Sequence, residues 1–342
     1  MVVAELVALK TFRVSERETP EPGPGQLQVK VGAIGICGSD MHVFAEGGIG
    51  DTLCNYPVIL GHEPAGTILK AGPGVTGYTV GANVALEPAI VCYHCEMCLK
   101  GKFNLCEVVK FMSSAGEPGF FRDVVNVPAG NTIPLPKHLG INEAALIEPL
   151  SVIVHSMKFA QLQLNETAVV WGAGPIGLLT VAALKIAGAK RIWAVEPVPH
   201  RREMALAMGA DAALDPAADP VKTILRDTDK RGVDVAFDCV AKGSSVNDCL
   251  KVLARAGRLI YTAIPSEIEV SFNMVAMRNK EITFYNVRRA NHEFNQARDL
   301  LAAHAKLFAP LLTHTRPLDR IQDAFDLVEN YADGVGKMLI TP

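Results

Sequence analysis

The sequence has no excess of positive charge and no run rich in Lys and Arg. Its 33 basic residues are outnumbered by 36 acidic ones, which gives a formal net charge of -3 at pH 7. Proteins that bind nucleic acids usually carry a basic patch that neutralises phosphates. The composition therefore gives no case for a nucleic-acid partner, and its 49% hydrophobic and 20% charged residues are typical of a globular protein.

The first residues lack the marks of a signal peptide. The segment Met-Val-Val-Ala-Glu-Leu-Val-Ala-Leu-Lys has no basic start and no cleavage site, and it contains an acid at Glu5. We expect a first strand here and a cytoplasmic protein. One uncharged stretch, 167–184, is long enough to suggest a membrane span, but three glycines and a proline interrupt its start. A strand, a glycine turn and a buried helix explain this stretch better, so we expect no membrane partner.

Without a signal peptide, the eight cysteines are not expected to form disulfides. Four of them follow the spacing C-x2-C-x2-C-x7-C, and thiolates this close can converge on one tetrahedral Zn²⁺ at about 2.3 Å each. Four sulfur ligands leave no open position, so the spacing predicts a structural zinc held by Cys92, Cys95, Cys98 and Cys106. Small buried hydrophobic positions are expected for Cys54, Cys239 and Cys249.

The length of 342 residues suggests two domains. The first, 1–150, is rich in Gly and Pro and carries short runs that predict a β-rich, barrel-like domain, with strands expected at 26–35, 58–61 and 65–74. The segment 142–164 is then expected to be helical, with Pro149 as a local disturbance.

From Glu166 onward, strands and helices alternate, which predicts a parallel, doubly wound sheet over 151–286. Its strands are expected at 168–171, 191–196, 233–239 and 258–263, and its helices at 176–187, 200–208 and 246–253. A third segment, 287–342, is expected to return to the first domain through helices at 294–306 and 321–331 and a strand at 337–340.

A dinucleotide fingerprint opens the second domain. Gly172-Ala-Gly174-Pro175-Ile176-Gly177 is G-x-G-x-x-G after a strand and before a helix, and Glu196 follows 19 residues past the last glycine. The glycines allow the pyrophosphate to approach the helix N-terminus. Glu196 is expected to accept hydrogen bonds from the adenosine ribose and to repel a 2′-phosphate, which favours NAD. Arg201 and Arg202 can in principle bind a phosphate, so NADP stays open.

A second group of metal-type ligands surrounds the cysteine cluster in the chain: Cys37, His62, Glu63 and Glu148. Three protein ligands and an open position make a catalytic zinc site, in which the metal acidifies a bound hydroxyl. Taken singly, a histidine is more often a satisfied polar residue and a cysteine more often a small core residue. The prediction depends on their combination with a closed cysteine site and a dinucleotide fingerprint.

The chain resembles the zinc-containing medium-chain dehydrogenases, and within them the sorbitol (polyol) dehydrogenase branch. The resemblance runs over nearly the whole chain. Its motifs are Cys37-Gly-Ser-Asp-x-His42, Gly61-His-Glu-x-x-Gly66, the cysteine cluster, Leu146-Ile-Glu-Pro-Leu-Ser-Val-x-x-His155, the glycine fingerprint and Thr313-His.

This resemblance implies a GroES-like catalytic domain, a Rossmann domain, and an oxidoreductase that transfers hydride from a secondary alcohol or polyol to NAD. It implies Cys37 and His62 as zinc ligands, with Glu63 as the third ligand and Glu148 either bound directly or reached through the metal-bound water. Ser39 and His42 match the proton relay, although a loop serine and a surface histidine are the plainer interpretations. A homodimer or homotetramer is expected.

Substrate contacts are implied at Val43, Phe111 and Arg288, with Arg289 as the alternative to Arg288. Polyol enzymes of this branch often have Tyr where Val43 stands, so the pocket is expected to be more apolar here. The family's ribose acid is usually Asp, one methylene shorter than Glu196. Two other functions stay open: a butanediol or amino-alcohol dehydrogenase with the same groups, and a non-catalytic NAD- or zinc-binding protein, which the presence of every ligand disfavours.

Overall fold

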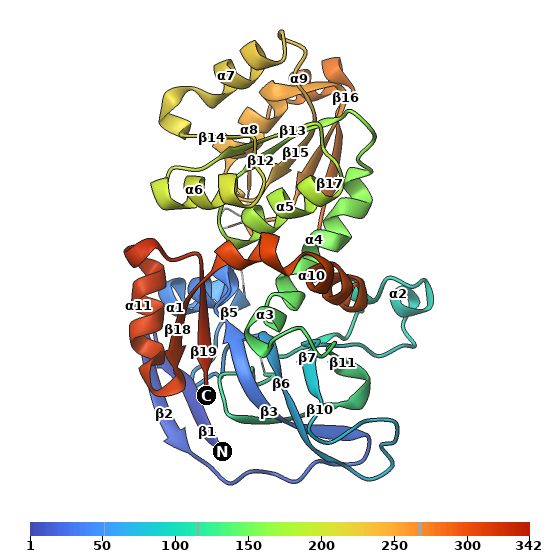
Figure 1. Cartoon of the computed structure of the whole chain (residues 1–342), viewed down its shortest axis with the longest axis vertical. Coiled ribbons are helices and arrows are strands. Elements are labelled where there is room, and N and C mark those ends of the chain that lie inside the picture. Colours follow the sequence, from blue (N-terminus) through green and yellow to red (C-terminus); the bar gives the residue numbers. More distant parts are fainter. Residues whose placement is uncertain (51, 115, 266–268) are drawn as a thin grey trace. The chain divides into compact units, whose positions relative to one another are not determined.

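The computed structural model describes residues 1–50, 52–114, 116–265 and 269–342 and contains two compact units (Figure 1). The first unit comprises Met1–Ser151, Asn291–Ala305 and Leu312–Pro342, and the second comprises Val152–Ala290 and Lys306–Leu311. The first boundary lies one residue from the expected one. The return to the first unit begins at residue 291, later than the expected 287, and 306–311 belongs to the second unit, because η4 (Ala309–Leu311) packs against α6 (Pro199–Ala207).

The first unit is built on a mixed sheet of seven strands. β3 (Gln26–Gly35) lies at its centre and alternates between buried and more exposed positions over its first half, as expected from its period-two sequence. The order is β11 (Thr132–Pro134), β7 (Asn83–Leu86), β6 (Glu63–Ala71), β3, β19 (Lys337–Thr341) and β18 (Leu312–Pro317), and β10 (Val124–Pro128) also pairs with β3.

Smaller elements complete this unit. A hairpin joins β1 (Val2–Ala8) to β2 (Thr11–Glu16), which confirms the expected first strand, and two short ribbons pair β4 (Gly48–Ile49) with β5 (Thr52–Leu53) and β8 (Ala89–Ile90) with β9 (Lys110–Phe111). The helices are α1 (Gly38–Glu46), α2 (Glu96–Leu99), α3 (Ile141–Ala144) and α11 (Ile321–Glu329), together with the start of α4 (Ile147–Ala160) and most of α10 (Phe294–Phe308).

Aromatic side chains fix α1 in the core of the first unit. The Phe325 ring of α11 lies 4.7 Å from the Phe12 ring, 5.0 Å from the Phe44 ring and 5.8 Å from the Phe121 ring, measured between centroids. Such pairs contribute about 0.5–1.5 kcal/mol each beyond their buried area. Because Phe44 belongs to α1, this cluster holds the helix that carries Ser39 and His42.

The second unit is the expected doubly wound sheet. Its strands run in the order β14 (Ala212–Leu214), β13 (Arg191–Val195), β12 (Thr167–Trp171), β15 (Val233–Asp238), β16 (Leu253–Tyr261) and β17 (Thr283–Asn286), and every pairing is parallel. The central strands are buried almost throughout, as in sheets covered on both faces. Against it pack α5 (Pro175–Ile186), α6, α8 (Gly243–Val252) and α9 (Met274–Lys280), while α7 (Pro220–Asp227) packs on α8.

Several expectations about individual elements were wrong. The segment 58–61 is not a strand, since only Val58 forms an isolated bridge, to Leu6. The helix expected over 142–164 is divided into α3 and α4 (Ile147–Ala160), and its break precedes Pro149, which fits in the first turn of α4, where a missing N–H is tolerated. The elements α7, α9, β14 and β17 were not predicted.

The apolar stretch 167–184 folds as β12, a glycine turn and the start of α5. Among the described residues, no helix combines the length and the apolar character needed to cross a membrane.

Candidate active site and metal centres

The ligand group expected to hold a catalytic zinc comes together at one end of β3 and β6. Cys37 is the N-cap of α1, two residues after β3 ends, and Glu63 is the first residue of β6 rather than a residue after a strand. One ligand atom from each of Cys37, His62 and Glu63 lies within 4.8 Å of the others. His62 and Glu63 are buried, so the group is withdrawn from bulk water.

Asp40 ties the loops that carry these ligands, and the sequence interpretation assigned it no role. Its carboxylate accepts hydrogen bonds from the backbone N–H of Cys37 at 3.0 Å and of Gly61 at 3.1 Å, and lies 3.4 Å from Nδ1 of His62. A carboxylate on one ring nitrogen of a ligand histidine orients the other nitrogen toward the metal. The signal in the sequence that could have indicated this role was the position of an acid three residues after the ligand Cys37.

Electrostatic contacts support the same arrangement. Burial acts to raise the pKa of Asp40, but His62 and the two backbone N–H donors outweigh it and hold that pKa below its ordinary value. Burial likewise acts to lower the pKa of His62, but Asp40 and Cys37 hold it well above its ordinary value. The negative surroundings of His62 favour a cation at this place.

Glu148 lies in the first turn of α4 and does not join the three-residue ligand group found among the described residues. Burial raises its pKa to about 7, and the charge of Glu63 adds to the effect, while His62 opposes it. The Glu148 carboxyl group therefore interacts electrostatically with the ligand group. It is not one of the residues whose ligand atoms all lie within 4.8 Å of one another.

Glu63 is also paired with Lys337, a residue that was expected to lie in a strand but was given no role from the sequence. The ammonium of Lys337, the first residue of β19, forms an ion pair with the Oε2 atom of Glu63. Burial acts to lower the pKa of Lys337, but Glu63 and Cys37 outweigh it and raise that pKa. The only signal in the sequence was one lysine at the head of an otherwise apolar strand, Lys337-Met-Leu-Ile.

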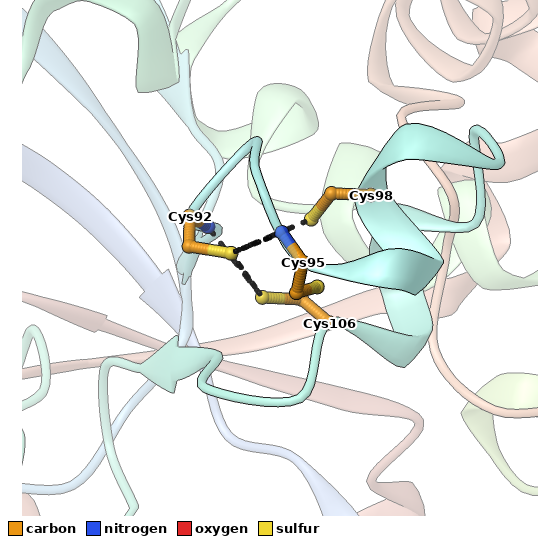
Figure 2. A group of neighbouring side chains, drawn as sticks. All are labelled: Cys92, Cys95, Cys98 and Cys106. Atoms are coloured by element: carbon orange, nitrogen blue, oxygen red, sulfur yellow. Dashed lines mark hydrogen bonds between the residues drawn. The ribbon is translucent and has the colours of Figure 1, made fainter.

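The four clustered cysteines converge as their spacing predicts. Figure 2 shows the four sulfur atoms facing one another from the loop around α2. The Cys92 and Cys106 sulfurs are 3.6 Å apart, and the Cys92 and Cys98 sulfurs are 3.9 Å apart. Backbone N–H groups of Cys98 and Glu107 lower the pKa of Cys95 to about 6, whereas burial and the neighbouring thiols raise that of Cys98 to about 12. A soft cation that binds thiolates fits this donor set.

The segment that returns to the first unit anchors this cysteine loop. The side-chain oxygen of Asn291 accepts a hydrogen bond from the backbone N–H of Phe103 at 2.7 Å, and its amide donates to the carbonyl of Gly101 at 2.8 Å. The His292 ring lies 4.4 Å from the Phe103 ring, and its Nδ1 lies 3.2 Å from the Glu87 carboxylate. Neither residue was singled out from the sequence.

The proposed relay and substrate residues differ in their surroundings. The Ser39 hydroxyl lies 3.4 Å from Nε2 of His62, and Nδ1 of His42 lies 3.2 Å from the Glu46 carboxylate on the same helix. The Phe111 ring lies 5.5 Å from the His62 ring. Val43, in contrast, is buried in the hydrophobic core of the first unit.

The glycine fingerprint forms the turn that its sequence predicts. Gly172 has φ +87°, a left-handed conformation that favours glycine, and a Cβ on Gly177 would collide with the Gly172 carbonyl. A Cβ on Gly174 would meet nothing nearer than the Arg201 guanidinium at 4.0 Å, so the backbone is open there. Gly174 caps α5, with Pro175 and Ile176 as its first residues, and the N-terminus of this helix can receive an anionic pyrophosphate.

The acidic residue after the second strand is buried against this turn. The Glu196 carboxylate accepts hydrogen bonds from the backbone N–H of Ala173 at 2.7 Å and of Val198 at 3.0 Å. Arg202 donates to the carbonyls of Glu196 and Pro197 and pairs with Asp215 at 3.2 Å. The Arg202 side chain is thus held by groups of the protein. The buried Arg201 guanidinium lies 4.0 Å from the position of a Cβ at Gly174.

Arg288 and Arg289 follow β17 in the second unit, and Arg288 is exposed. Arg289 has φ +54°, a conformation that L side chains seldom adopt. The ligand group of Cys37, His62 and Glu63 belongs to the first unit.

The residues present suit zinc at both places. One site offers four thiolates, and the other offers a thiolate, an imidazole and a carboxylate, which leaves a fourth position open. The Oε1 atom of Glu63 is buried and has no hydrogen-bond partner within the described residues, as expected for an atom reserved for a cation.

Two family models match the chain. Residues 23–137 match the alcohol dehydrogenase GroES-like domain, and residues 175–303 match the zinc-binding dehydrogenase domain. The chain is 32% identical to the sorbitol dehydrogenase of Bacillus subtilis over 100% of its own length and 97% of the relative. It is also 32% identical to the L-threonine 3-dehydrogenase of Pyrococcus abyssi, over 95% of the chain and 93% of the relative.

Solved structures of similar fold are also dehydrogenases. A zinc-binding dehydrogenase of Sinorhizobium meliloti bound to NADP superposes with a TM-score of 0.91 at 29% identity, covering 100% of this chain and 99% of that one. An alcohol dehydrogenase of Escherichia coli in complex with NADH gives 0.91 at 28%, with coverage of 100% and 99%. The 2R,3R-butanediol dehydrogenase of Bacillus subtilis gives 0.90 at 30%, again with coverage of 100% and 99%.

These matches confirm the GroES-like and Rossmann fold expected from the sequence, and they confirm an oxidoreductase that uses zinc and a nicotinamide cofactor. The chain belongs to the zinc-containing medium-chain dehydrogenases, in the branch that includes the sorbitol dehydrogenases.

Proposed function

We propose that this enzyme oxidises a secondary alcohol that carries a neighbouring hydroxyl to the corresponding ketone, with NAD as the hydride acceptor. The observation that carries the proposal is the ligand group of Cys37, His62 and Glu63, which leaves a fourth zinc position open. The same chain has the glycine turn of a dinucleotide-binding fingerprint. When bound, zinc supplies a Lewis acid that lowers the pKa of the substrate hydroxyl, and NAD accepts the hydride from its carbon.

The protein's own residues position the metal ligands and move the proton. Asp40 orients His62, so that one ring nitrogen faces the carboxylate and the other faces the Ser39 side. In this proposal Ser39 receives the substrate proton, and His42, three residues further along α1, passes it toward solvent. The contact of His42 with Glu46 supports this role. Oxidation of the alcohol to the ketone thus removes one hydride from carbon, which reduces the cofactor, and one proton from oxygen, which is released to solvent.

The acids of the site favour a substrate with two adjacent polar groups. Glu63 lies in the ligand group, and Glu148 is buried and coupled to it electrostatically. Carboxylate oxygens can accept a hydrogen bond from a second hydroxyl, directly or through water.

The cofactor preference is proposed from Glu196. A buried carboxylate next to the glycine turn disfavours a 2′-phosphate at the adenosine ribose. We also propose that the chain binds two zinc ions, because two separate ligand groups are present.

An amino-alcohol such as threonine is a second candidate substrate, because it also presents a polar group beside the reacting hydroxyl. The relatives named threonine and butanediol dehydrogenases share the fold of this chain. The experiment that separates the candidates is NADH formation with polyols, butanediol, threonine and simple secondary alcohols.

The decisive comparison is kcat/KM for a vicinal diol against the matching mono-alcohol. A site built to pair a second hydroxyl should favour the diol by about 100-fold or more, since the mono-alcohol leaves buried polar groups unpaired. Equal values, or a preference for the mono-alcohol, would leave only a general secondary-alcohol dehydrogenase.

Chelation tests the metal requirement. Removal of the open-site zinc should abolish turnover while the cofactor still binds at the glycine turn, and His62→Ala should have the same effect. Turnover that survives either treatment would point to a zinc-independent reductase.

A further inference from the structure

Lys337 stands apart from the other lysines of the described residues. It is 1% exposed, and among those residues it is the one lysine that is fully buried. Lysine is almost never buried without a partner, because removing the ammonium from water is costly. Its partner is Glu63, a member of the open ligand group.

The sheet explains how the pair forms between residues so distant in the sequence. β19 and β6 flank β3 on opposite sides, and Gly35 of β3 lies opposite both Leu339 and Glu63. Side chains two residues apart on a strand share a face, so Lys337 lies on the same face as Leu339. Its side chain reaches Glu63 by crossing over the central strand at Gly35.

Gly35 provides the space for this crossing. A Cβ at Gly35 would lie 2.7 Å from Cε of Lys337 and still closer to Oε2 of Glu63. The backbone of Gly35 does not adopt a positive φ. Glycine is therefore needed at this position for space, and a larger side chain would push the ion pair apart.

Lys337 also lies close enough to interact with the other acidic groups of the site. The ligand group and its neighbour contribute a thiolate and two carboxylates from Cys37, Glu63 and Glu148, and the ammonium interacts with all of them. Without the ion, Lys337 is the cation paired directly with Glu63.

We propose that Lys337 is a positioning residue that holds Glu63 by one carboxylate oxygen. Glu63 then offers the metal only its other oxygen, and Lys337 serves as the countercharge of Glu63 when no metal is bound. This inference rests on the open zinc site proposed above. Zinc must therefore share Glu63 with an ammonium group, which weakens zinc binding and stabilises the metal-free fold.

The test compares the wild type with Lys337→Met, which keeps the length of the side chain and removes its charge. Two quantities are measured: the zinc dissociation constant of the open site by competition with a chelator, and Tm with and without the open-site zinc. Loss of the nearby positive charge should tighten zinc binding by about 10-fold or more. The drop in Tm should be larger for the metal-depleted form than for the zinc-loaded form.

A spectroscopic measurement separates positioning from a purely structural role. With Co²⁺ at the open site, the visible absorption bands of Lys337→Met should shift, because both oxygens of Glu63 become available to the metal. Met338→Ala is the matched control, since Met338 is the next residue of β19 and is equally buried. That variant should lose stability to the same extent in both forms, with an unchanged zinc affinity and Co²⁺ spectrum.

If Lys337→Met folds only when zinc is supplied, its metal-free form cannot be measured. The double variant Glu63→Gln with Lys337→Met then provides the test. Removal of both charges should restore the metal-free fold, because no uncompensated carboxylate remains. An equal loss of stability in both metal states, with unchanged affinity and spectrum, would overturn the role of Lys337, as would failure of the double variant to recover. A wild type that binds no zinc at the open site would instead refute the site itself.

Discussion

The carboxylate of Glu196 accepts a hydrogen bond from the backbone N–H of Ala173 at 2.7 Å, which joins the acid after the second strand to the middle of the glycine turn. Its other oxygen accepts the N–H of Val198. The residue proposed to select the cofactor therefore also fixes the loop on which the cofactor's pyrophosphate would lie. A substitution of Glu196 should affect both functions.

Glu196→Ala should narrow the preference for NAD over NADP, because the buried negative charge that opposes a 2′-phosphate is removed. It should also raise KM for both cofactors, since the turn loses an acceptor. The measurement is kcat/KM for each cofactor at saturating alcohol. Glu203→Ala is a suitable control, because Glu203 is an exposed acid on the neighbouring helix α6. If the wild type used NADP equally well, the interpretation of Glu196 would be wrong and Arg201 would become a phosphate ligand.

Cys98→Ser should remove one of the two zinc ions expected from the two ligand groups. Because a structural metal contributes directly to folding free energy, Tm should fall by about 5 °C or more. Metal analysis and thermal unfolding check this result, and the open-site zinc should be retained. Cys54→Ser, a cysteine outside both groups, should leave the zinc content unchanged. A fully loaded wild type with a single zinc would contradict the two-site proposal.

The pair of His292 and Glu87 should make the stability of the first unit depend on pH. The Glu87 carboxylate raises the pKa of His292, although burial opposes it. The stabilisation is therefore complete below the unfolded pKa of about 6.5 and is lost as the pH rises through the folded pKa. The expected size is about 1 kcal/mol or less.

His292→Gln should remove this part of the pH dependence. Unfolding of the wild type and the variant is compared at about pH 6 and about pH 9, on either side of the histidine titration. The two proteins should differ more at the lower pH. A difference that is constant, or that grows with pH, would mean that the ring contact with Phe103 rather than the charge is what stabilises the cysteine loop.

Gly35→Ala should lower zinc occupancy at the open site, because the added methyl group would collide with Oε2 of Glu63 and displace this metal ligand itself. The added methyl group meets the Lys337 and Glu63 side chains, and overpacking of this kind usually costs about 1–3 kcal/mol. Gly130→Ala is the matched control, because a Cβ at Gly130 meets no atom within 4 Å. Zinc content and Tm are measured for both variants, and a normally loaded Gly35→Ala protein would show that the space at Gly35 is not limiting.

The features that the sequence determined by itself are those encoded by neighbouring residues. The spacing of Cys92 to Cys106 allows four sulfurs to meet within one loop, and the glycines from 172 to 177 shape a single turn. The alternation of apolar runs after Glu166 likewise specifies a parallel sheet, since each strand and helix is a local pattern. These predictions needed no knowledge of distant contacts.

The tertiary structure decided which distant residues meet. The contact of Asp40 with His62 joins a helix to the start of a strand, and that of Lys337 with Glu63 crosses the central strand of a sheet whose order places β19 and β6 on either side of β3. Strand order and register arise from the packing of the whole unit, so no spacing in the chain reveals them. For the same reason, a lysine that looks in the sequence like an ordinary strand residue becomes the buried partner of a metal ligand.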